Sequence, residues 1–449
     1  MNSVSMNNLW TYLKGLRMKP ERMILLLLFP TLLIGCGSGN DNEPQLVSPQ
    51  EEEAVLPGEN STPEVVPFSL TDTQRNAVMR SNDFAFNLHR MINANEEWND
   101  KSYVVSPMSL AFVLSMLNDG AVGNTSQQLM QLLGIPTNDK AAYQELCKLL
   151  IEQLPKTDEQ VQMRLADLVA ADKSVTMHDA YCKGVRDSYH AEVATLNFGT
   201  VEATSYVNDW CKEQTEGMIP KIVDNLRGVL AVLNAVYFKA VWSGKFDAKE
   251  TTDENFTLED GTQVSLPMMH REDYAYYYHG DIFTTLGLPY GSGQHWMMYV
   301  LLPNEGKTVA DVAGALSAEK WETIAEKVKS MGMSVDVKLP RFRVESEFEL
   351  NDVLKQMGAT AMFEPHGEFP LITQQALDLY VTMVKQKAAV EVTEEGTEAA
   401  AVTIALITTA AGPDAEPFVM KFHAKKPFLF LIQESTSSAI PFMGIFRGM

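Results

Sequence analysis

The spacing of apolar residues predicts helices in the first half of the chain. In residues 71–94 they recur every three or four positions, which is the period of one face of an amphipathic helix. Residues 106–120 are apolar almost throughout, begin with a Ser-Pro cap and first turn, and end at a glycine, which predicts a buried helix. A third helix is expected to start at position 201 and to end near Gly217.

Strand patterns dominate the second half. Residues 228–242 are rich in β-branched side chains and almost continuously apolar, as in the interior strand of a sheet covered on both faces. Residues 333–345 and 377–392 alternate more clearly, and two short strands are expected at 425–434 and 441–448. Helices come mainly early and strands mainly late, without a regular βαβ rhythm, which predicts an α+β fold.

The amino terminus has the pattern of an export signal. Basic residues precede the apolar run 24–34, which is too short to span a bilayer, and Cys36 follows at once. This segment resembles a bacterial lipobox, which implies removal of residues 1–35 and lipidation of Cys36. A plain signal peptide with a coincidental cysteine is the alternative, and Met18 or Met23 could be the initiator.

Residues 36–67 are rich in Gly, Asn, Glu, Pro and Ser and lack an apolar period, so we expect a disordered acidic tether. The globular pattern begins at Phe68 and leaves 449 − 67 = 382 residues. Because there is no internal repeat and no second linker, residues 68–449 are expected to form one domain.

The chain is strongly acidic, with a formal net charge of −22. The leader has four basic residues and one acidic residue, so the mature chain would carry −22 − 3 = −25. This charge argues against nucleic acid and heparin as partners, although it is also explained by solubility alone. Three cysteines remain after lipidation, and an odd number does not predict a disulfide framework; we interpret Cys147, Cys182 and Cys211 as buried or idle thiols.

The usual catalytic and cofactor motifs are missing from the sequence. It has no HExxH, no CxxC pair, no GxxxxGK[ST] and no GxSxG. No two histidines have the spacing of a zinc pair, and His270 and His279 flank a tyrosine-rich strand pattern. Residues 291–293 (Gly-Ser-Gly) predict a hairpin turn, not a phosphate loop. We expect no metal, no cofactor and no enzyme, with a triad of distant residues left open.

One segment gives contradictory signals. Residues 394–418, EEGTEAAAVTIALITTAAGPDAEPF, begin with good helix formers and continue with a β-branched apolar run. No proline interrupts residues 394–411, so the segment could enter a sheet, yet it lies where a loop is expected.

Residues 68–449 contain several long segments in a distinctive order: YVVSPMSLAFVLSMLNDGAVGNTSQQLMQLL, LAVLNAVYFKAVWSGKFDAKET, LPMM, LGLPY, YVLLPNE, VKLPRFRVESEFELNDVLKQMGA and FHAKKPFLFLI with FMGIFRG. In these segments and their order, residues 68–449 resemble the serpin family. The resemblance implies helices packed on a large mixed main sheet, two smaller sheets, and an exposed reactive-centre loop at about 394–418.

The resemblance also implies an activity. A serine protease, or a cysteine protease, cleaves the loop as a substrate. Before the acyl-enzyme hydrolyses, the loop inserts into the main sheet as a new strand and traps the protease. The alternatives are a non-inhibitory member that acts as a binding or carrier module, and an uncharacterised hydrolase.

The loop residues permit such an insertion. From Thr397 to Thr409 the odd-numbered side chains, which would turn inward, are all uncharged and mostly small, while Glu398 falls on the opposite face. By resemblance, the hinge comprises Glu394, Glu395, Gly396, Thr397, Glu398, Ala399, Ala400 and Ala401.

The resemblance assigns further roles. Ser106, Ser109 and Asn234 correspond to a polar cluster beneath the point where the strands part, with Gln386 where the family often has histidine. Trp242 corresponds to a tryptophan at the top of the sheet. Ordinary core and helix-cap roles are the alternative for all five.

The expected target follows from the residues at the scissile bond. The resemblance implies this bond at Ala410–Ala411, at the family's usual distance from Glu394, within the range Leu406–Gly412. Small residues before the cut suit elastase-like or subtilisin-like proteases, whereas the lack of Lys and Arg argues against trypsin-like targets. We expect a monomer held by its lipid in the cell envelope as an outer-membrane lipoprotein, facing the periplasm or the surface.

Overall fold

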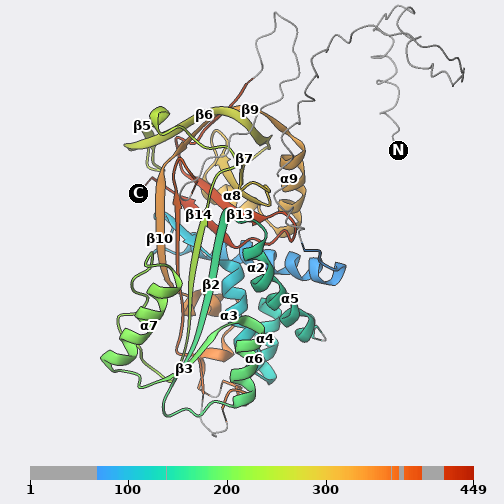
Figure 1. Ribbon diagram of the computed structural model, residues 1–449, viewed down its shortest axis with the longest axis vertical. Helices are drawn as coiled ribbons and strands as arrows, with labels where there is room; N and C mark the ends of the chain where they lie inside the picture. Colours follow the sequence, from blue (N-terminus) through green and yellow to red (C-terminus); the bar gives the residue numbers. More distant parts are fainter. Residues whose placement is uncertain (1–67, 138, 366, 374–378, 397–418, 449) are drawn as a thin grey trace, which may run out of the picture. The chain divides into compact units, whose positions relative to one another are not determined.

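The computed structural model describes residues 68–137, 139–365, 367–373, 379–396 and 419–448 (Figure 1). The expected α+β class is confirmed, because helices precede and pack on two β-sheets.

The three helices expected from the apolar period are present as α2 (Asp72–Ala94), α3 (Pro107–Gly120) and α7 (Val201–Gln214). Helix α2 starts with a capping box between Thr71 and Gln74, which satisfies two backbone donors of its first turn. The remaining helices and 3₁₀ turns are α4 (Gly123–Leu132), α5 (Lys140–Gln153), η2 (Leu154–Lys156), α6 (Asp179–Tyr189), η3 (Ala248–Glu250), α8 (Val309–Ala315), α9 (Ala318–Ser330), α10 (Asn351–Gln356) and η4 (Ala361–Phe363).

A five-stranded sheet contains the long apolar strand that the sequence predicts. Its spatial order is β10 (Phe342–Glu349), β11 (Met383–Val392), β4 (Leu230–Ala240), β2 (Val161–Asp172) and β3 (Glu192–Leu196). Neighbouring strands β11 and β4 are parallel, as are β2 and β3, while the other two pairs are antiparallel.

Both faces of strand β4 are buried, which explains its nearly continuous apolar sequence. Its even-numbered side chains, such as Val232 and Val236, join the large core that also contains α3 and the second sheet. Its odd-numbered side chains, such as Leu233, join a smaller core with Val207 and Trp210 of α7. Helix α7 therefore covers one face of the five-stranded sheet.

The other described strands form one nine-stranded sheet, where the family resemblance implies two smaller ones. Strand β6 is 17 residues long; its last four residues, from Tyr276 to His279, pair with β7, and its middle pairs with β9. Because β6 pairs with both neighbours, it joins the two expected sheets into one. In order, the strands are β1 (Tyr103–Val105), β14 (Phe442–Phe446), β13 (Phe428–Glu434), β8 (Trp296–Pro303), β7 (Phe283–Tyr290), β6 (Gln263–His279), β9 (Gly332–Pro340) and β12 (Met420–His423), with β5 (Thr252–Thr257) on β6.

Two strand predictions need adjustment. Residues 333–345 form parts of two strands in different sheets, because β9 ends at Pro340 and β10 starts two residues later. Of residues 377–392, the strand comprises only Met383–Val392. The hairpin predicted at 291–293 is present between β7 and β8.

Candidate functional site

Strands β4 and β11 separate at one end of the five-stranded sheet. Their parallel pairing runs from Ala231 and Met383 to Tyr237 and Ala389 and then stops. Each strand continues for three more residues, held only by its outer neighbour: β4 pairs with β2, and β11 with β10. We call this the open end of the sheet.

The chain reverses direction at the open end. Thr393 and Gly396 close a two-residue turn, with N···O distances of 2.9 Å from Thr393 N to Gly396 O and 3.2 Å in return. Gly396 also forms an antiparallel bridge with Val241, which directly follows β4. Gly396 therefore lies between the extensions of the two separated strands and is antiparallel to both.

Only glycine suits position 396. Its φ is +106°, in the region that L side chains rarely adopt. A Cβ there would lie 2.5 Å from Ala240 O and 2.5 Å from Trp242 N, and neither backbone atom is free to move away.

Hydrogen bonds to its backbone carbonyls hold the turn to the segment after β4. Trp242 Nε1 donates to Thr393 O at 2.9 Å, and its backbone N donates to Glu395 O at 3.1 Å. The backbone N of Phe246 donates to Glu394 O at 3.0 Å. Three consecutive carbonyls of the turn are thus satisfied by one neighbouring segment.

The two glutamates of the turn are also paired. Glu394 is buried; its Oε1 accepts from Thr251 Oγ1 at 2.8 Å and lies 3.4 Å from Arg341 Nη1. Glu395 Oε2 lies 2.6 Å from Lys245 Nζ. A buried carboxylate without such partners would be strongly destabilising, so these contacts help to fix the turn.

Trp242 lies at the open end, away from the other four residues grouped with it from the sequence. Its side chain is buried and stacks on Tyr290, with ring centroids 4.1 Å apart and an interplanar angle of 9°. The Trp242 side chain therefore packs in the core and also donates a hydrogen bond to the turn.

The other four residues meet in the middle of the sheet, where β4 and β11 are still paired. Gln386 Nε2 donates to Asn234 Oδ1 and to Ser106 O, both at 2.9 Å, and Gln386 Oε1 accepts from Ser106 N at 2.8 Å. Asn234 Nδ2 also donates to Ser109 Oγ. All four residues are buried. Their part in sheet opening stays a prediction.

The expectation that Ser106 caps α3 is only half right. The residue occupies the N-cap position, but its hydroxyl forms no capping bond. Its backbone instead pairs with Gln386, and its Oγ is buried without a hydrogen-bond partner in the part of the chain described.

Sequence reasoning missed Asp167. It lies on β2 directly across from Asn234, whose Nδ2 donates to its Oδ1 at 2.7 Å. Burial raises the pKa of this carboxyl to about 7, although the hydrogen bond from Asn234 acts in the opposite direction. The signal was visible, because Asp167 is the one charged residue within the otherwise apolar run 165–171.

Several predicted positions lie outside the described residues. They are the signal segment 1–35, the tether 36–67 with Cys36, the hinge residues Thr397, Glu398, Ala399, Ala400 and Ala401, and the reactive bond Ala410–Ala411.

The described residues offer little alternative chemistry. They contain no cluster of three or more His, Cys, Asp or Glu side chains suited to a metal ion. Among them, no helix combines the length and the apolar character needed to cross a membrane. Cys147 and Cys211 are buried free thiols, and Cys182 is free and half-buried.

Comparison with known proteins identifies the family of this chain. The family model for Serpin (serine protease inhibitor) matches residues 79–447. An uncharacterized serpin-like protein of Thermococcus kodakarensis is 32% identical over 436 residues, which make up 94% of this chain and 98% of that protein.

Solved structures agree on the fold. Human thyroxine-binding globulin, solved in complex with thyroxine, has a TM-score of 0.74 and 25% sequence identity, and the match covers 83% of this chain and 98% of that one. The thermophilic serpin tengpin in its native state has a TM-score of 0.75 and 23% identity, covering 85% and 96%. The chain belongs to the serpin family, whose members are generally protease inhibitors rather than enzymes.

Proposed function

We propose that this protein is a suicide-substrate inhibitor of serine proteases, in which the cleaved loop becomes a new strand between β4 and β11. The observation that carries the proposal is the position of Gly396. It already bridges to Val241 on one side and to Thr393 on the other. A strand that continued from Gly396 would run antiparallel to both neighbours without any further reversal of the chain.

The register of this new strand follows from the existing bridges. Each step forward from Gly396 along the loop corresponds to one step back from Val241 along β4. Asn234 is seven residues before Val241, so it would lie beside the residue seven after Gly396, which is Thr403.

The β11 side gives the same register independently. Gln386 is seven residues before Thr393, which bridges to Gly396, so Gln386 would also lie beside Thr403. Insertion would separate Asn234 from Gln386 and place a hydroxyl group between them. Because a hydroxyl both donates and accepts, Thr403 can replace part of the hydrogen bonding that the two amides lose.

The same register assigns faces to the loop side chains. Cross-strand neighbours project to the same face, so odd-numbered loop residues would join the even-numbered residues of β4 in the large core. None of those loop residues is charged, and the opposite face of residues 397–409 has one charge, that of Glu398. Glu398 would lie on the other face, between Lys239 and Glu391, which are both half-buried.

The length of β4 fits a cut near the predicted bond. Leu230, the first residue of β4, is eleven residues before Val241 and would meet the residue eleven after Gly396, Ile407. A cut at Ala410–Ala411, or at any other bond between Ile407 and Gly412, would leave enough chain to reach Leu230. The small residues there support elastase-like and subtilisin-like targets, and cysteine proteases are a further target class.

The decisive experiment is incubation of the purified chain with neutrophil elastase, followed by boiling in SDS. We expect a covalent complex whose size is the sum of protease and inhibitor, and none with elastase whose active-site serine has been blocked. Cleaved inhibitor together with fully active protease would contradict the proposal.

Specificity can be tested at the scissile bond. Ala410→Arg is expected to redirect complex formation from elastase to trypsin, because trypsin requires a basic residue before the cut. Mass spectrometry of the released carboxy-terminal peptide identifies the bond that is cleaved.

A binding or carrier function is the second candidate. It is supported by the likeness to thyroxine-binding globulin in complex with thyroxine. It predicts that cleavage of the loop leaves the unfolding temperature unchanged, whereas the inhibitor proposal predicts a large rise because the sheet gains a strand.

We further propose that the protein is a monomeric lipoprotein of the cell envelope, with residues 1–35 removed, Cys36 lipidated and residues 36–67 as a tether. The basic, apolar and Cys36 pattern supports this. Cys36→Ala is expected to move the protein from the membrane fraction to the soluble fraction. Equal membrane association of both proteins would contradict lipid attachment.

A further inference from the structure

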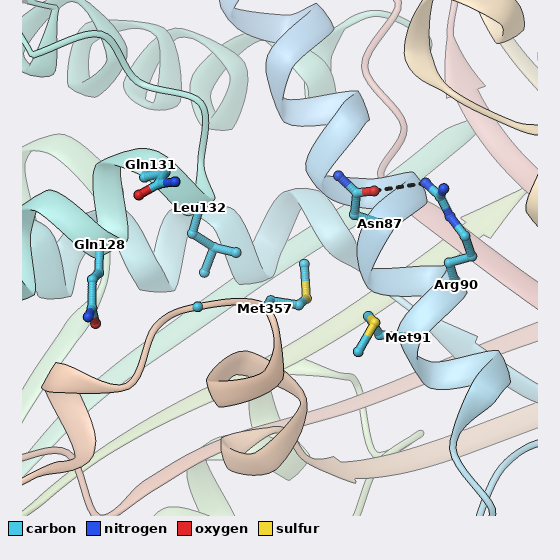
Figure 2. A pocket seen from close by; sticks show the side chains of 8 residues that line it. Asn87, Arg90, Met91, Gln128, Gln131, Leu132 and Met357 are labelled. Carbon is cyan, nitrogen blue, oxygen red and sulfur yellow. Dashed lines mark hydrogen bonds between the residues drawn. The ribbon is translucent and has the colours of Figure 1, made fainter.

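A pocket of about 440 Å³ lies between helices α2 and α4 and the chain that follows α10 (Figure 2). Each of the two helices contributes residues at i, i+3 and i+4. Residues with this spacing share one face of a helix, so the pocket is lined by one face of α2 and one face of α4. The lining residues used below are Asn87, Arg90, Met91, Gln128, Leu132 and Met357. None of them belongs to the five-stranded sheet.

The pocket contains one charge, that of Arg90. The other lining residues are neutral. Arg90 Nη2 donates to Asn87 Oδ1 at 2.8 Å, as the dashed line in Figure 2 marks. Its Nε is buried and makes no hydrogen bond, and within the described part of the chain the guanidinium forms no ion pair. The pocket is therefore lined by a positive charge that pairs with no carboxylate among the described residues.

The field of this charge reaches the neighbouring core. The pKa of His89 falls to about 3, first because the imidazole is buried and then because Arg447 and Arg90 repel its protonated form. His89 is therefore neutral at physiological pH and adds no second cation to the pocket.

Three residues make part of the wall apolar, and a polar residue holds the pocket in place. Met91, Leu132 and Met357 are partly buried and pack on the main core. Met91 on α2 and Met357 after α10 both line the pocket, as labelled in Figure 2. Gln128 Oε1 accepts from the backbone N of Thr360 at 2.9 Å and of Ala361 at 2.8 Å. This ties the segment after α10 to α4, so the pocket is formed before any ligand arrives.

We propose that this pocket binds a small organic carboxylate with an aliphatic chain. The carboxylate lies on Arg90, whose planar fork matches its two oxygens, and the chain lies between Leu132 and the two methionines. Methionine side chains adapt well to aliphatic ligands, and the volume suits a small molecule. The positive charge disfavours amines and metal cations.

Titration calorimetry of the full chain with sodium octanoate tests the proposal. We expect saturable one-site binding, with octylammonium giving none and octan-1-ol binding more weakly. Arg90→Gln is expected to weaken octanoate binding about tenfold or more, because a charge-assisted pair is lost. The matched control is Arg75→Gln on the same helix, whose exposed ion pair with Asp72 lies outside the pocket; it should bind octanoate like the parent.

Thermal unfolding shows whether Arg90→Gln is folded. A second variant keeps the test valid if it is not. Leu132→Trp fills the apolar end of the pocket and is expected to abolish octanoate binding while leaving Arg90 in place. Absence of saturable octanoate binding up to about 10 mM would overturn the proposal. Equal affinity in the parent and in either folded pocket variant would also overturn it. None of these results bears on protease inhibition, which does not involve this pocket.

Discussion

The middle and the open end of the β4–β11 pair differ in how the two strands are held. In the middle of the sheet, Asn234 and Gln386 join the strands directly through a 2.9 Å hydrogen bond and connect them to α3. At the open end no pairing remains between the strands, and Gly396 stands between them. The place where a new strand would start is thus already formed, while its path is closed by a buried polar cluster.

This difference indicates the order of events. Opening the middle of the sheet first would leave buried amides unpaired, at about 1–3 kcal/mol for each group. If the loop inserts as proposed, insertion from the open end would instead add one residue at a time next to a strand already in place. The cluster would be reached only at Thr403, whose hydroxyl could offer new hydrogen bonds. On this proposal the open end sets where insertion starts, and the cluster sets how easily the loop passes.

The largest effect is expected from Thr403→Arg, which would bring a charge into the large core beside Asn234 and Gln386. An unpaired buried charge costs several kcal/mol or more, so insertion should fail and the chain should become a plain elastase substrate. The readout is SDS-stable complex on a gel, with cleavage measured in parallel.

Glu398→Arg is the control, because it introduces the same side chain on the opposite, half-buried face. It should still form the complex. Equal loss of complex in both variants would show that the assigned faces are wrong.

The next largest effect is expected from Asp167→Asn, on the pH dependence of the free energy of unfolding. The folded-state pKa of about 7 lies above the unfolded value of 3.8, so the folded protein binds this proton more tightly. The contribution of Asp167 to the free energy of unfolding is therefore fully present at low pH and is lost as the pH rises from about 4 to about 7. Asp167→Asn removes the charge but keeps an acceptor for Asn234.

The gain in unfolding free energy of Asp167→Asn over the parent should grow by about 1–4 kcal/mol between pH 4 and pH 8. Denaturant unfolding at several pH values measures it. Parallel stability curves for the two proteins would refute the buried-charge explanation.

Much of the fold could be predicted from residue periodicity, and the site only in part. The apolar pattern of 228–242 indicates a covered strand, and the structure has one there. The pairing of Asn234 with Gln386, 152 residues later, depends on the parallel register, which no local pattern shows. Asp167 was visible as a lone charge in an apolar run, but its partner was not.

The turn at Glu394 and Glu395 illustrates the limit further. Its sequence shows a glycine and two acids, which many loops contain. What fixes it are Thr251, Arg341 and Lys245 from distant segments, and only the folded chain brings these together. The extra length of β6, which merges two expected sheets, likewise shows only in the pairing of its neighbours.

A smaller effect is expected from Gly396→Ala. The new Cβ would meet Ala240 O and Trp242 N at 2.5 Å, so the turn must move out of the open end. We expect a loss of about 1–3 kcal/mol in stability and slower formation of the elastase complex.

Gly358→Ala is the matched control, since its φ of +105° is nearly the same but no atom lies within 4 Å of its Cβ. Thermal unfolding and rates of complex formation should separate backbone strain from close contact. If both alanine variants behave alike, the contact with β4 has no special role.

The smallest effect is expected from Trp242→Phe, which keeps an aromatic ring near Tyr290 but removes the 2.9 Å hydrogen bond to Thr393 O. The expected loss in stability is about 0.5–1.5 kcal/mol. Amide hydrogen exchange should rise for residues 393–396 and stay unchanged around Asn234. Faster exchange at Asn234 instead would mean that the open end and the middle are not separable.

A crystal structure of the chain after elastase has cut its loop tests the central claim most directly. The account predicts a sixth strand between β4 and β11, antiparallel to both, with Thr403 flanked by Asn234 and Gln386. A structure in which those two side chains still bond to each other, with the cut ends outside the sheet, would contradict it.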